Sequence, residues 1–423
     1  MVKCFIFENF KSFEKAELNI ETLTTLIGTN ASGKSNAIEG ITVLAMLAAG
    51  LELSTILDGT KNIGTSIRGG SHGCTRFRTS TFKLGCLIDW DDNQDLLYEI
   101  RIRVNGNVMV DEEGLYLVEV DSLGPKKNPV FKTKKADYDR IEIKVQYKNG
   151  KKGMNPDTIC VRSSAILPQI AGKVLRESNE EREIASMLEK MISQLKNIMI
   201  LNPVPSEIRN YVRVTDVELR TNCDNLSAVL NKMCKKKKEK EHLLEIVKDL
   251  PENDILGIEF IETKIGDVIF ALREKYLKNS ELVDARQLSD GTLRCIAILT
   301  AILMSEPNSI IVIEEIDNGI HPARVSKLIS RLVQIGNERQ VDVVITTHNA
   351  ALMNSYRKGE LVGVSVVYRE KEKGTSKITS FVDIEDFPNM LVSGGLGNAM
   401  IDESLLKTLK DEKKTKDYSW LGV

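Results

Sequence analysis

The sequence lacks the features that would mark a secreted, disulfide-linked or membrane-spanning protein. None of its seven cysteines forms a C-x-x-C pair, and such an odd, scattered set is typical of reduced thiols rather than disulfides or a zinc site. The first residues, MVKCFIFENFKSF, lack the long apolar segment of a signal peptide. The longest apolar stretches, 41–49 and 295–304, are too short to span a bilayer. We therefore expect a cytoplasmic protein that does not enter a membrane.

A large excess of charge of one sign is also missing. The formal net charge is −2, so any binding to nucleic acid would need a local basic patch. Hydrophobic residues make up 42% and charged residues 28% of the chain, which is ordinary for a globular protein. A length of 423 residues is enough for one large core or for two to three domains.

The hydrophobic pattern predicts an α/β protein interrupted by a helical segment. Short apolar runs predict strands over 2–8 and 17–27, and residues 76–150 are rich in strand patterns separated by turns. Charged amphipathic helices dominate 165–250, and then the buried-strand runs SIIVIEEID and VDVVITTHN flank a helix at 323–336. We expect an N-terminal lobe (1–164), a helical insertion or lid (165–254) and a C-terminal lobe with a tail (255–423).

A phosphate-binding loop is the most specific motif. GTNASGKS at 28–35 fits G-x-x-x-x-G-K-[ST] between a predicted strand and a predicted helix. Backbone N–H groups and the helix N-terminus would surround the α- and β-phosphates. Lys34 would reach the β- and γ-phosphates, and Ser35 would ligate Mg²⁺. The predicted nucleotide-binding residues here are Gly28, Asn30, Ala31, Ser32, Gly33, Lys34, Ser35 and Asn36.

An acidic pair and a histidine at strand ends complete a predicted hydrolytic site. The apolar run from Ile310 to Ile313 ends in Glu314 and Glu315. We expect Glu314 to hold Mg²⁺ through water and Glu315 to act as the general base. His348 follows the next buried strand, where its ring can face a γ-phosphate. The predicted catalytic residues are thus Lys34, Glu315 and His348.

LSDGT at 288–292 offers a hydroxyl, a small residue and then an apolar helix, which suits a phosphate at a helix start. The alternative is that Ser289 or Asp290 only caps that helix.

The order of phosphate loop, long insertion, LSDGT, acidic strand end and histidine resembles the ABC-type ATPases of the SMC and RecF-like branch. ENFKSF (8–13) resembles the opening of SMC and RecF-like proteins. EEIDNGIHP (314–322) resembles a stretch of the ATPase subunits of bacterial antiphage defence systems such as Septu, PARIS, retron-associated and Gabija-like systems. Glu314 departs from the usual Asp.

This resemblance implies an ABC-type core with a mixed sheet, an antiparallel β lobe and an inserted helical lid, using ATP and Mg²⁺. It implies that Ser289 and Gly291 contact a nucleotide bound by a second copy, head to tail. It also implies that Gln169, in SAILPQIAG, senses the γ-phosphate and Mg²⁺.

We expect an ATPase that controls a separate effector, such as a nuclease, in antiphage defence. Asp383, Glu385 and Asp386 are better explained by a surface turn than by a nuclease centre. A RecF-like DNA-repair ATPase is the alternative, and LSDGT disfavours a transporter subunit.

The insertion and the tail, with Tyr418 and Trp420, would dock the partner. Lys235–Lys238 would be a solvated lid tip or a nucleic-acid contact.

Overall fold

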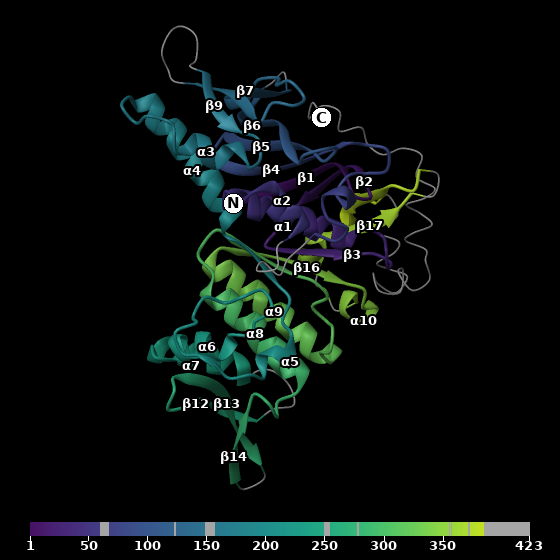
Figure 1. The fold of residues 1–423 in the computed structure, drawn as a ribbon. Helices are drawn as coiled ribbons and strands as arrows, with labels where there is room; N and C mark the ends of the chain where they lie inside the picture. Colours follow the sequence, from purple (N-terminus) through teal and green to yellow (C-terminus); the bar gives the residue numbers. More distant parts are fainter. Residues whose placement is uncertain are drawn as a thin grey trace.

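A mixed sheet of 14 strands forms the upper part of the molecule (Figure 1). The computed structural model describes residues 1–59, 67–121, 124–148, 157–248, 254–276, 279–354, 356, 358–370 and 373–384. The strand order is β10 (Ile198–Leu201), β15 (Ser309–Ile313), β16 (Val341–Thr347), β3 (Leu23–Ile27), β17 (Val364–Arg369), β18 (Ser376–Ser380), β2 (Phe13–Asn19), β1 (Val2–Phe10), β4 (Thr81–Asp91), β5 (Gln94–Arg103), β6 (Met109–Asp121), β7 (Gly124–Thr133), β8 (Glu142–Tyr147) and β9 (Asp157–Val161).

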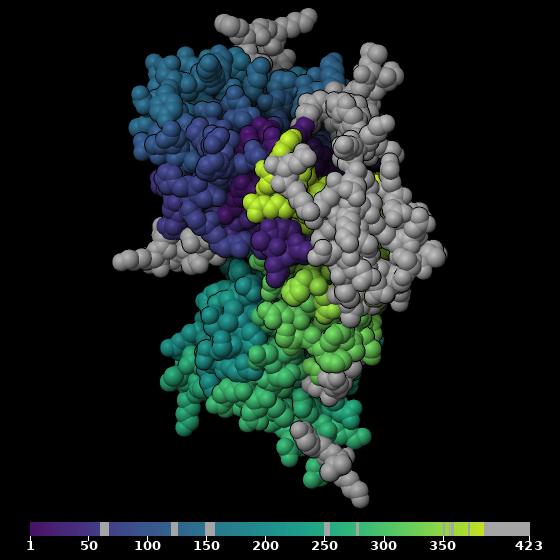
Figure 2. Space-filling model, turned by 90° about the vertical axis from the view of Figure 1, so that its right-hand side faces the viewer, coloured from purple at the N-terminus to yellow at the C-terminus, as the bar shows by residue number. Residues whose placement is uncertain are grey.

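The two halves of this sheet differ in strand direction. The strands β10, β15, β16, β3 and β17 run parallel, so their carboxyl ends meet at one edge. From β2 through β1 and β4 to β9 every pairing is antiparallel. Figure 2 shows the yellow β17 and β18 beside the purple N-terminal strands, where the two halves join. The predicted fold class, α/β with a mixed sheet and an antiparallel β lobe, is confirmed.

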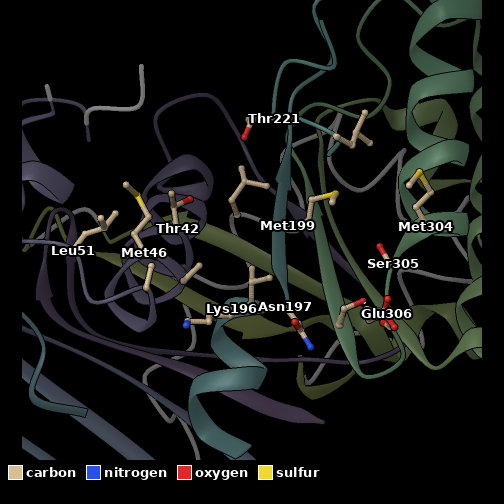
Figure 3. A pocket seen from close by; sticks show the side chains of 16 residues that line it. Thr42, Met46, Leu51, Lys196, Asn197, Met199, Thr221, Met304, Ser305 and Glu306 are labelled. Carbon is tan, nitrogen blue, oxygen red and sulfur yellow. The ribbon is translucent and has the colours of Figure 1, made fainter. Parts of the chain in front are cut away.

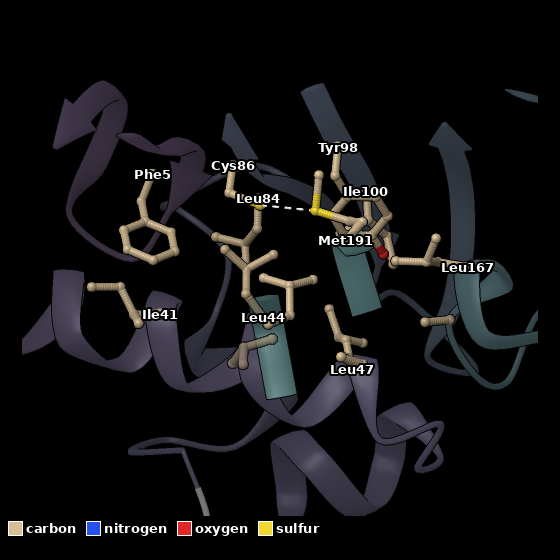
Figure 4. Close-up of a cluster of buried hydrophobic side chains, with 14 of the residues drawn as sticks. Phe5, Ile41, Leu44, Leu47, Leu84, Cys86, Tyr98, Ile100, Leu167 and Met191 are labelled. Atoms are coloured by element: carbon tan, nitrogen blue, oxygen red, sulfur yellow. Dashed lines mark hydrogen bonds between the residues drawn. The ribbon is translucent and has the colours of Figure 1, made fainter. Parts of the chain in front are cut away.

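Helices pack against the upper sheet through apolar residues at helical spacing. They are α1 (Lys34–Ala48), α2 (Leu53–Asp58), α3 (Ile166–Ala171) and α4 (Asn179–Lys196). Ile41, Leu44 and Leu47 of α1 point into the same buried cluster as Cys86 of β4 (Figure 4). Met191 of α4 reaches that cluster, with its sulfur 3.6 Å from the Cys86 sulfur. The helix that follows the phosphate loop is therefore anchored along its whole length.

The lower part has its own apolar core, built around α8 and α9 (Figure 1). Its helices are α5 (Pro205–Ile208), α6 (Leu226–Cys234), α7 (Lys237–Lys248), α8 (Asp290–Met304) and α9 (Pro322–Arg339). A small antiparallel sheet joins β11 (Val212–Arg213), β12 (Ile255–Glu262), β13 (Asp267–Tyr276) and β14 (Asn279–Asp284). The short elements η1 (Ser71–Gly73), α10 (Ala350–Met353), η2 (Lys358–Gly363) and η3 (Phe381–Asp383) complete the described chain.

The segment 165–254, predicted as a helical insertion, is divided between the two parts of the molecule. Its first half belongs to the upper part, because α4 packs on α1, α3 packs on α4, and β10 extends the large sheet. Its second half, α5 to α7, packs with α8 and with the small sheet. Amphipathic patterns reveal an apolar face but not the partner that covers it. No helix in the described ranges is long and apolar enough to cross a membrane.

Candidate nucleotide-binding site

The phosphate loop leaves the central parallel strand β3, all five residues of which are buried. Its backbone takes conformations that suit small residues, with φ of 61° at Ala31 and 122° at Gly33. A Cβ on Gly28 would lie 2.1 Å from the carbonyl oxygen of Val367 in β17. The loop thus fits tightly against the neighbouring strand, and α1 begins directly after it at Lys34.

Two polar groups in this loop suit a phosphate. The ammonium of Lys34 donates to the carbonyl oxygens of Gly28, at 2.7 Å, and Thr29, at 3.0 Å, so it lies across the loop. Burial lowers the pKa of Lys34, while the carboxylates of Glu315 and Glu314 act in the opposite direction. The hydroxyl oxygen of Ser32 is buried and has no hydrogen-bond partner. A bound phosphate oxygen would accept from both side chains.

The acidic strand end meets the start of α1. The hydroxyl of Ser35 donates to the carboxylate of Glu314, which follows β15. A hydroxyl beside a carboxylate matches a Mg²⁺ site of the phosphate-loop type, in which phosphate oxygens and waters supply the remaining ligands. Within the described ranges, no cluster of three or more His, Cys, Asp or Glu side chains could hold a metal by itself. These residues therefore fit a Mg²⁺ that arrives with a nucleotide.

Glu315 lies next to this pair in an unusual backbone conformation. Its φ is 50°, a left-handed value that is rare for a residue with a side chain. The hydroxyl of Thr346 in β16 accepts from the Glu315 N–H at 2.8 Å, and the Thr346 carbonyl accepts from Ile316 at 3.2 Å. Strained residues held by their surroundings cluster at functional sites. The turn thus presents an exposed carboxylate, and β16 holds that turn in place.

His348 emerges beside the phosphate loop. Thr347, the last residue of β16, pairs with Ile27, the last residue of β3. His348 is exposed at that position, one residue beyond the strand. The sheet therefore brings the phosphate loop, Glu314, Glu315 and His348 to one edge, as their places after parallel strands require.

Two serines that the sequence did not single out support the loop from behind. The hydroxyl of Ser376 in β18 donates to the Ser32 carbonyl at 2.5 Å, and its oxygen lies 2.7 Å from the Ser12 hydroxyl oxygen. The Asn36 amide donates to the same Ser12 hydroxyl at 2.7 Å. Ser12 belongs to the ENFKSF segment, so that motif was the feature of the sequence that could have pointed to this residue. Ser376 lies 344 residues from Ser32, and no local pattern points to it.

A cationic pair flanks the same helix. Glu39 of α1 binds Lys11 at 2.7 Å and the Arg68 side chain at 2.8 Å. The Lys11 ammonium also donates to the Arg68 carbonyl at 2.7 Å. Hydrogen bonding to Glu39 raises the pKa of Arg68, and the more distant Glu314 acts in the same direction. Arg68 thus lies within the electrostatic field of the site.

LSDGT lies in the lower part of the molecule, away from α1 (Figure 1). Ser289 is exposed and is the N-cap of α8, where its hydroxyl oxygen accepts from the Thr292 N–H at 3.2 Å. The capping alternative is therefore correct as a description of one chain. Gly291 packs closely on the loop after Glu315, since a Cβ there would lie 2.8 Å from the Gly319 carbonyl oxygen. The LSDGT helix is thus coupled to the acidic loop within the chain.

Gln169 is not at the phosphate loop. Its side-chain oxygen accepts from the Val161 N–H at 2.9 Å, and its nitrogen donates to the Val161 carbonyl at 2.8 Å. The adjacent Pro168 lies 3.8 Å from a Cβ built on Gly50, just beyond the C-terminal end of α1. The phosphate loop lies at the other end of this 15-residue helix, roughly 22 Å away at 1.5 Å per residue. This position gives no support to the predicted role of Gln169 at the γ-phosphate and Mg²⁺.

The remaining predicted surfaces lie elsewhere. Lys235–Lys238 are exposed around the start of α7, where Lys236 pairs with Glu239 at 2.8 Å. Glu385, Asp386, Tyr418 and Trp420 lie outside the described residues.

A groove of about 550 Å³ opens between α1, β10 and the end of α8, with Met46, Met199 and Met304 in its wall (Figure 3). Its lining contains none of the predicted nucleotide-binding residues, so it is separate from the candidate site.

Comparison with known proteins gives one family match. Residues 237–354 match a model described as "AAA domain, putative AbiEii toxin, Type IV TA system". The match covers less than half of the chain; it includes LSDGT, Glu314, Glu315 and His348 but not the phosphate loop. It supports an ATPase activity. No curated protein sequence matches the chain.

Solved SMC head domains are similar in structure at low sequence identity. A SmcHead bound to the C-winged helix domain of ScpA has a TM-score of 0.49 and 14% identity, covering 89% of this chain and 97% of that one. The SMC head domain from Thermotoga maritima has a TM-score of 0.43 and 13% identity, covering 90% and 98%. An Smc head from Pyrococcus furiosus, bound to the C-terminal domain of ScpA, has a TM-score of 0.46 and 13% identity, covering 96% and 99%.

Proposed function

We propose that the chain binds ATP with Mg²⁺ at the carboxyl edge of its parallel strands and hydrolyses it to ADP and phosphate. The observation that carries this proposal is the contact between Ser35 and Glu314 beside the Lys34 ammonium. One site thus contains a cation for the phosphates, a hydroxyl and a carboxylate for the metal, and a second carboxylate for the attacking water. The family match to residues 237–354 supports the same activity.

Each side chain has a distinct task in this reaction. Lys34 moves from the loop carbonyls to the β- and γ-phosphates, and the backbone N–H groups from Asn30 to Ser35 surround the phosphate oxygens. Mg²⁺, held by Ser35 and Glu314, would neutralise charge on the β- and γ-phosphates. Glu315 accepts the proton of the attacking water, and His348 contacts the γ-phosphate from the end of β16.

Two copies of the chain assemble head to tail around ATP. Ser289 and the Gly291 N–H then contact the γ-phosphate on the partner's phosphate loop. The exposure of Ser289 supports this arrangement, and α8 lies in the lower part of the molecule, apart from α1 (Figure 1). A helix N-terminus favours an anion at that position. ATP binding closes the pair, and hydrolysis releases it.

The cellular setting that we propose is antiphage defence in the cytoplasm, with a separate effector controlled by the ATP cycle. The description of the matched family as a putative AbiEii toxin favours such a setting over DNA repair. A RecF-like repair ATPase is the second candidate. The exposed Lys235–Lys238 would be its contact with DNA, although Lys236 is already paired with Glu239.

The test of this proposal compares substitutions in one assay of ATP binding and turnover. Lys34→Ala should abolish ATP binding, because the phosphates lose their buried cation. Glu315→Gln should bind ATP but turn it over at least ~10²-fold more slowly, as loss of a general base typically does. Wild-type ATP affinity in a folded Lys34→Ala protein would exclude this site. If Glu314→Gln stops ATP turnover with Mg²⁺ and ATP still bound, and Glu315→Gln does not, then Glu314 is the general base and Glu315 the magnesium-side residue.

A further inference from the structure

Arg324 reaches the LSDGT helix from a different helix and is almost completely buried. It lies near the start of α9, is 6% exposed, and donates from its guanidinium to the Thr292 hydroxyl oxygen at 3.0 Å. Thr292 is 2% exposed, and its hydroxyl lies 2.8 Å from the Ser289 hydroxyl. A continuous contact therefore runs from a buried cation, through Thr292, to the exposed Ser289.

The direction of these hydrogen bonds follows from the chemistry of the groups. A guanidinium can only donate, so the Thr292 oxygen accepts from Arg324. The positive charge of Arg324 repels the Thr292 hydroxyl proton, so of the two possible directions for the 2.8 Å contact with Ser289 we take Thr292 as the donor. The Ser289 oxygen also accepts from the Thr292 N–H at 3.2 Å. With two donors directed at this oxygen, the proton of Ser289 points outward.

Neighbouring contacts keep the same surface suited to an anion. Arg209 donates to the Asp290 carboxylate at 2.6 Å and to the Leu288 carbonyl at 2.8 Å. The carboxylate of Asp290, next to Ser289 in the sequence, is therefore paired with the cation that directly follows α5. Close packing of Gly291 on Gly319 fixes the first turn of α8.

We propose that Arg324 and Thr292 are positioning residues that hold the Ser289 hydroxyl as an outward donor to a phosphate oxygen. This inference rests on the proposed function, because that phosphate is the one on the partner copy's loop. It adds a link within the chain: α9 follows directly on the acidic loop 314–321, so a movement of that loop changes the donor presented to the other site.

The test uses two buried threonines of the same helix. Thr292→Val removes the hydroxyl with little change in shape, and Thr292→Ser keeps it. Thr300→Val is the matched control, because Thr300 is 0% exposed and its hydroxyl donates to the Ile296 carbonyl of its own helix. ATP binding, turnover number, KM and the thermal midpoint are measured for each full-length variant, together with Ser289→Ala and Arg324→Lys.

We expect Thr292→Val to lower kcat about tenfold or more, as loss of a hydrogen bond to a charged group does, with ATP affinity of the separate chain unchanged. Thr292→Ser should restore kcat to within about twofold, and Thr300→Val should keep it. Arg324→Lys should lower kcat in the same direction as Thr292→Val.

The possible results distinguish a failure of the proposed function from a failure of the positioning role of Arg324 and Thr292. A wild-type chain that does not bind ATP overturns the proposed function and this inference with it. An impaired Ser289→Ala together with an unimpaired Thr292→Val overturns this inference alone. Equal losses in Thr292→Val and Thr300→Val, or no rescue by Thr292→Ser, overturn it as well, because a purely structural role would then explain the data.

Discussion

Asp342 is a buried carboxylate in the strand that carries His348. It lies on β16, pairs in register with Ile310 of β15, and is 6% exposed. Burial raises the pKa of Asp342 to about 7, the N-terminal amine opposes this shift, and Glu21 and Asp89 add to it. An aspartate in an unfolded chain has a pKa of about 3.9. Folding therefore favours the protonated form of this side chain.

The pH dependence of stability follows from that difference. Between about pH 4 and pH 7 the folded chain binds more protons at Asp342 than the unfolded chain, so the free energy of unfolding falls as pH rises. The stabilisation is complete below about pH 4 and is lost above about pH 7. Asp342→Asn should raise the free energy of unfolding at pH 8 by roughly 1–3 kcal/mol and should have little effect at pH 4.

Thermal midpoints at several pH values check this prediction. Asp139→Asn is the control, because it removes the same charge from an exposed position. A midpoint that rises equally at pH 4 and pH 8 in Asp342→Asn would contradict the assigned cause.

At the scale of single elements, β9 is the edge strand that Gln169 protects. The side chains of Ile159 and Val161 are 52% and 43% exposed, so this edge combines apolar surface with open backbone groups. The Gln169 amide bonds both the N–H and the C=O of Val161, as a neighbouring strand would. Lys173 of the same region donates to the Ile159 carbonyl. Natural sheets block their edges in such ways against pairing between molecules.

Gln169→Ala should therefore lower stability by about 1–2 kcal/mol and promote self-association that does not depend on ATP. Light scattering and thermal midpoints, with and without ATP, measure both effects. The matched control is Gln334→Ala, on the exposed face of α9, where the amide contacts only Arg331 and Glu338. Loss of ATP turnover in Gln169→Ala without a change in stability would instead indicate that Gln169 acts at the nucleotide site.

At the scale of the whole molecule, the sequence could predict those parts of the candidate site that consist of residues close together in the chain. The motif around Lys34 and the acids after Ile313 follow buried parallel strands, and such strands bring their ends together. Contacts between distant segments were not predictable in this way. Ser376 reaches the loop only because β18 lies next to β2, and α4 covers α1 because their apolar faces match. The position of Gln169 was not predictable either, because a short motif does not state which end of α1 it meets.

Complementation between two defective chains tests the head-to-tail pair. A Ser289→Arg chain keeps its phosphate loop, and a Lys34→Ala chain keeps its Ser289, so a mixed pair has one complete site. Each variant alone should be inactive, and an equal mixture should recover roughly a quarter of wild-type turnover, since half of the pairs are mixed and each has one site of two.

The control for this experiment is a chain that carries both substitutions. Mixed with either single variant, it should restore nothing, because no pair then contains a complete site. Full ATPase activity of Ser289→Arg as an isolated monomer would rule out the cross-subunit arrangement.

The last prediction is that this chain needs a partner protein to damage its target. Cleavage of nucleic acid with metal ions requires a cluster of carboxylates, and the described residues contain no group of three or more side chains that could hold a metal. In the proposed function, ATP hydrolysis changes only the assembly of the two copies, which is useful only if another protein responds to it. The purified chain should hydrolyse ATP but leave DNA and RNA intact with Mg²⁺ or Mn²⁺. A protein encoded beside it should co-purify. Robust cleavage by the chain alone, lost in Asp383→Ala but kept in Glu315→Gln, would show that it carries its own effector.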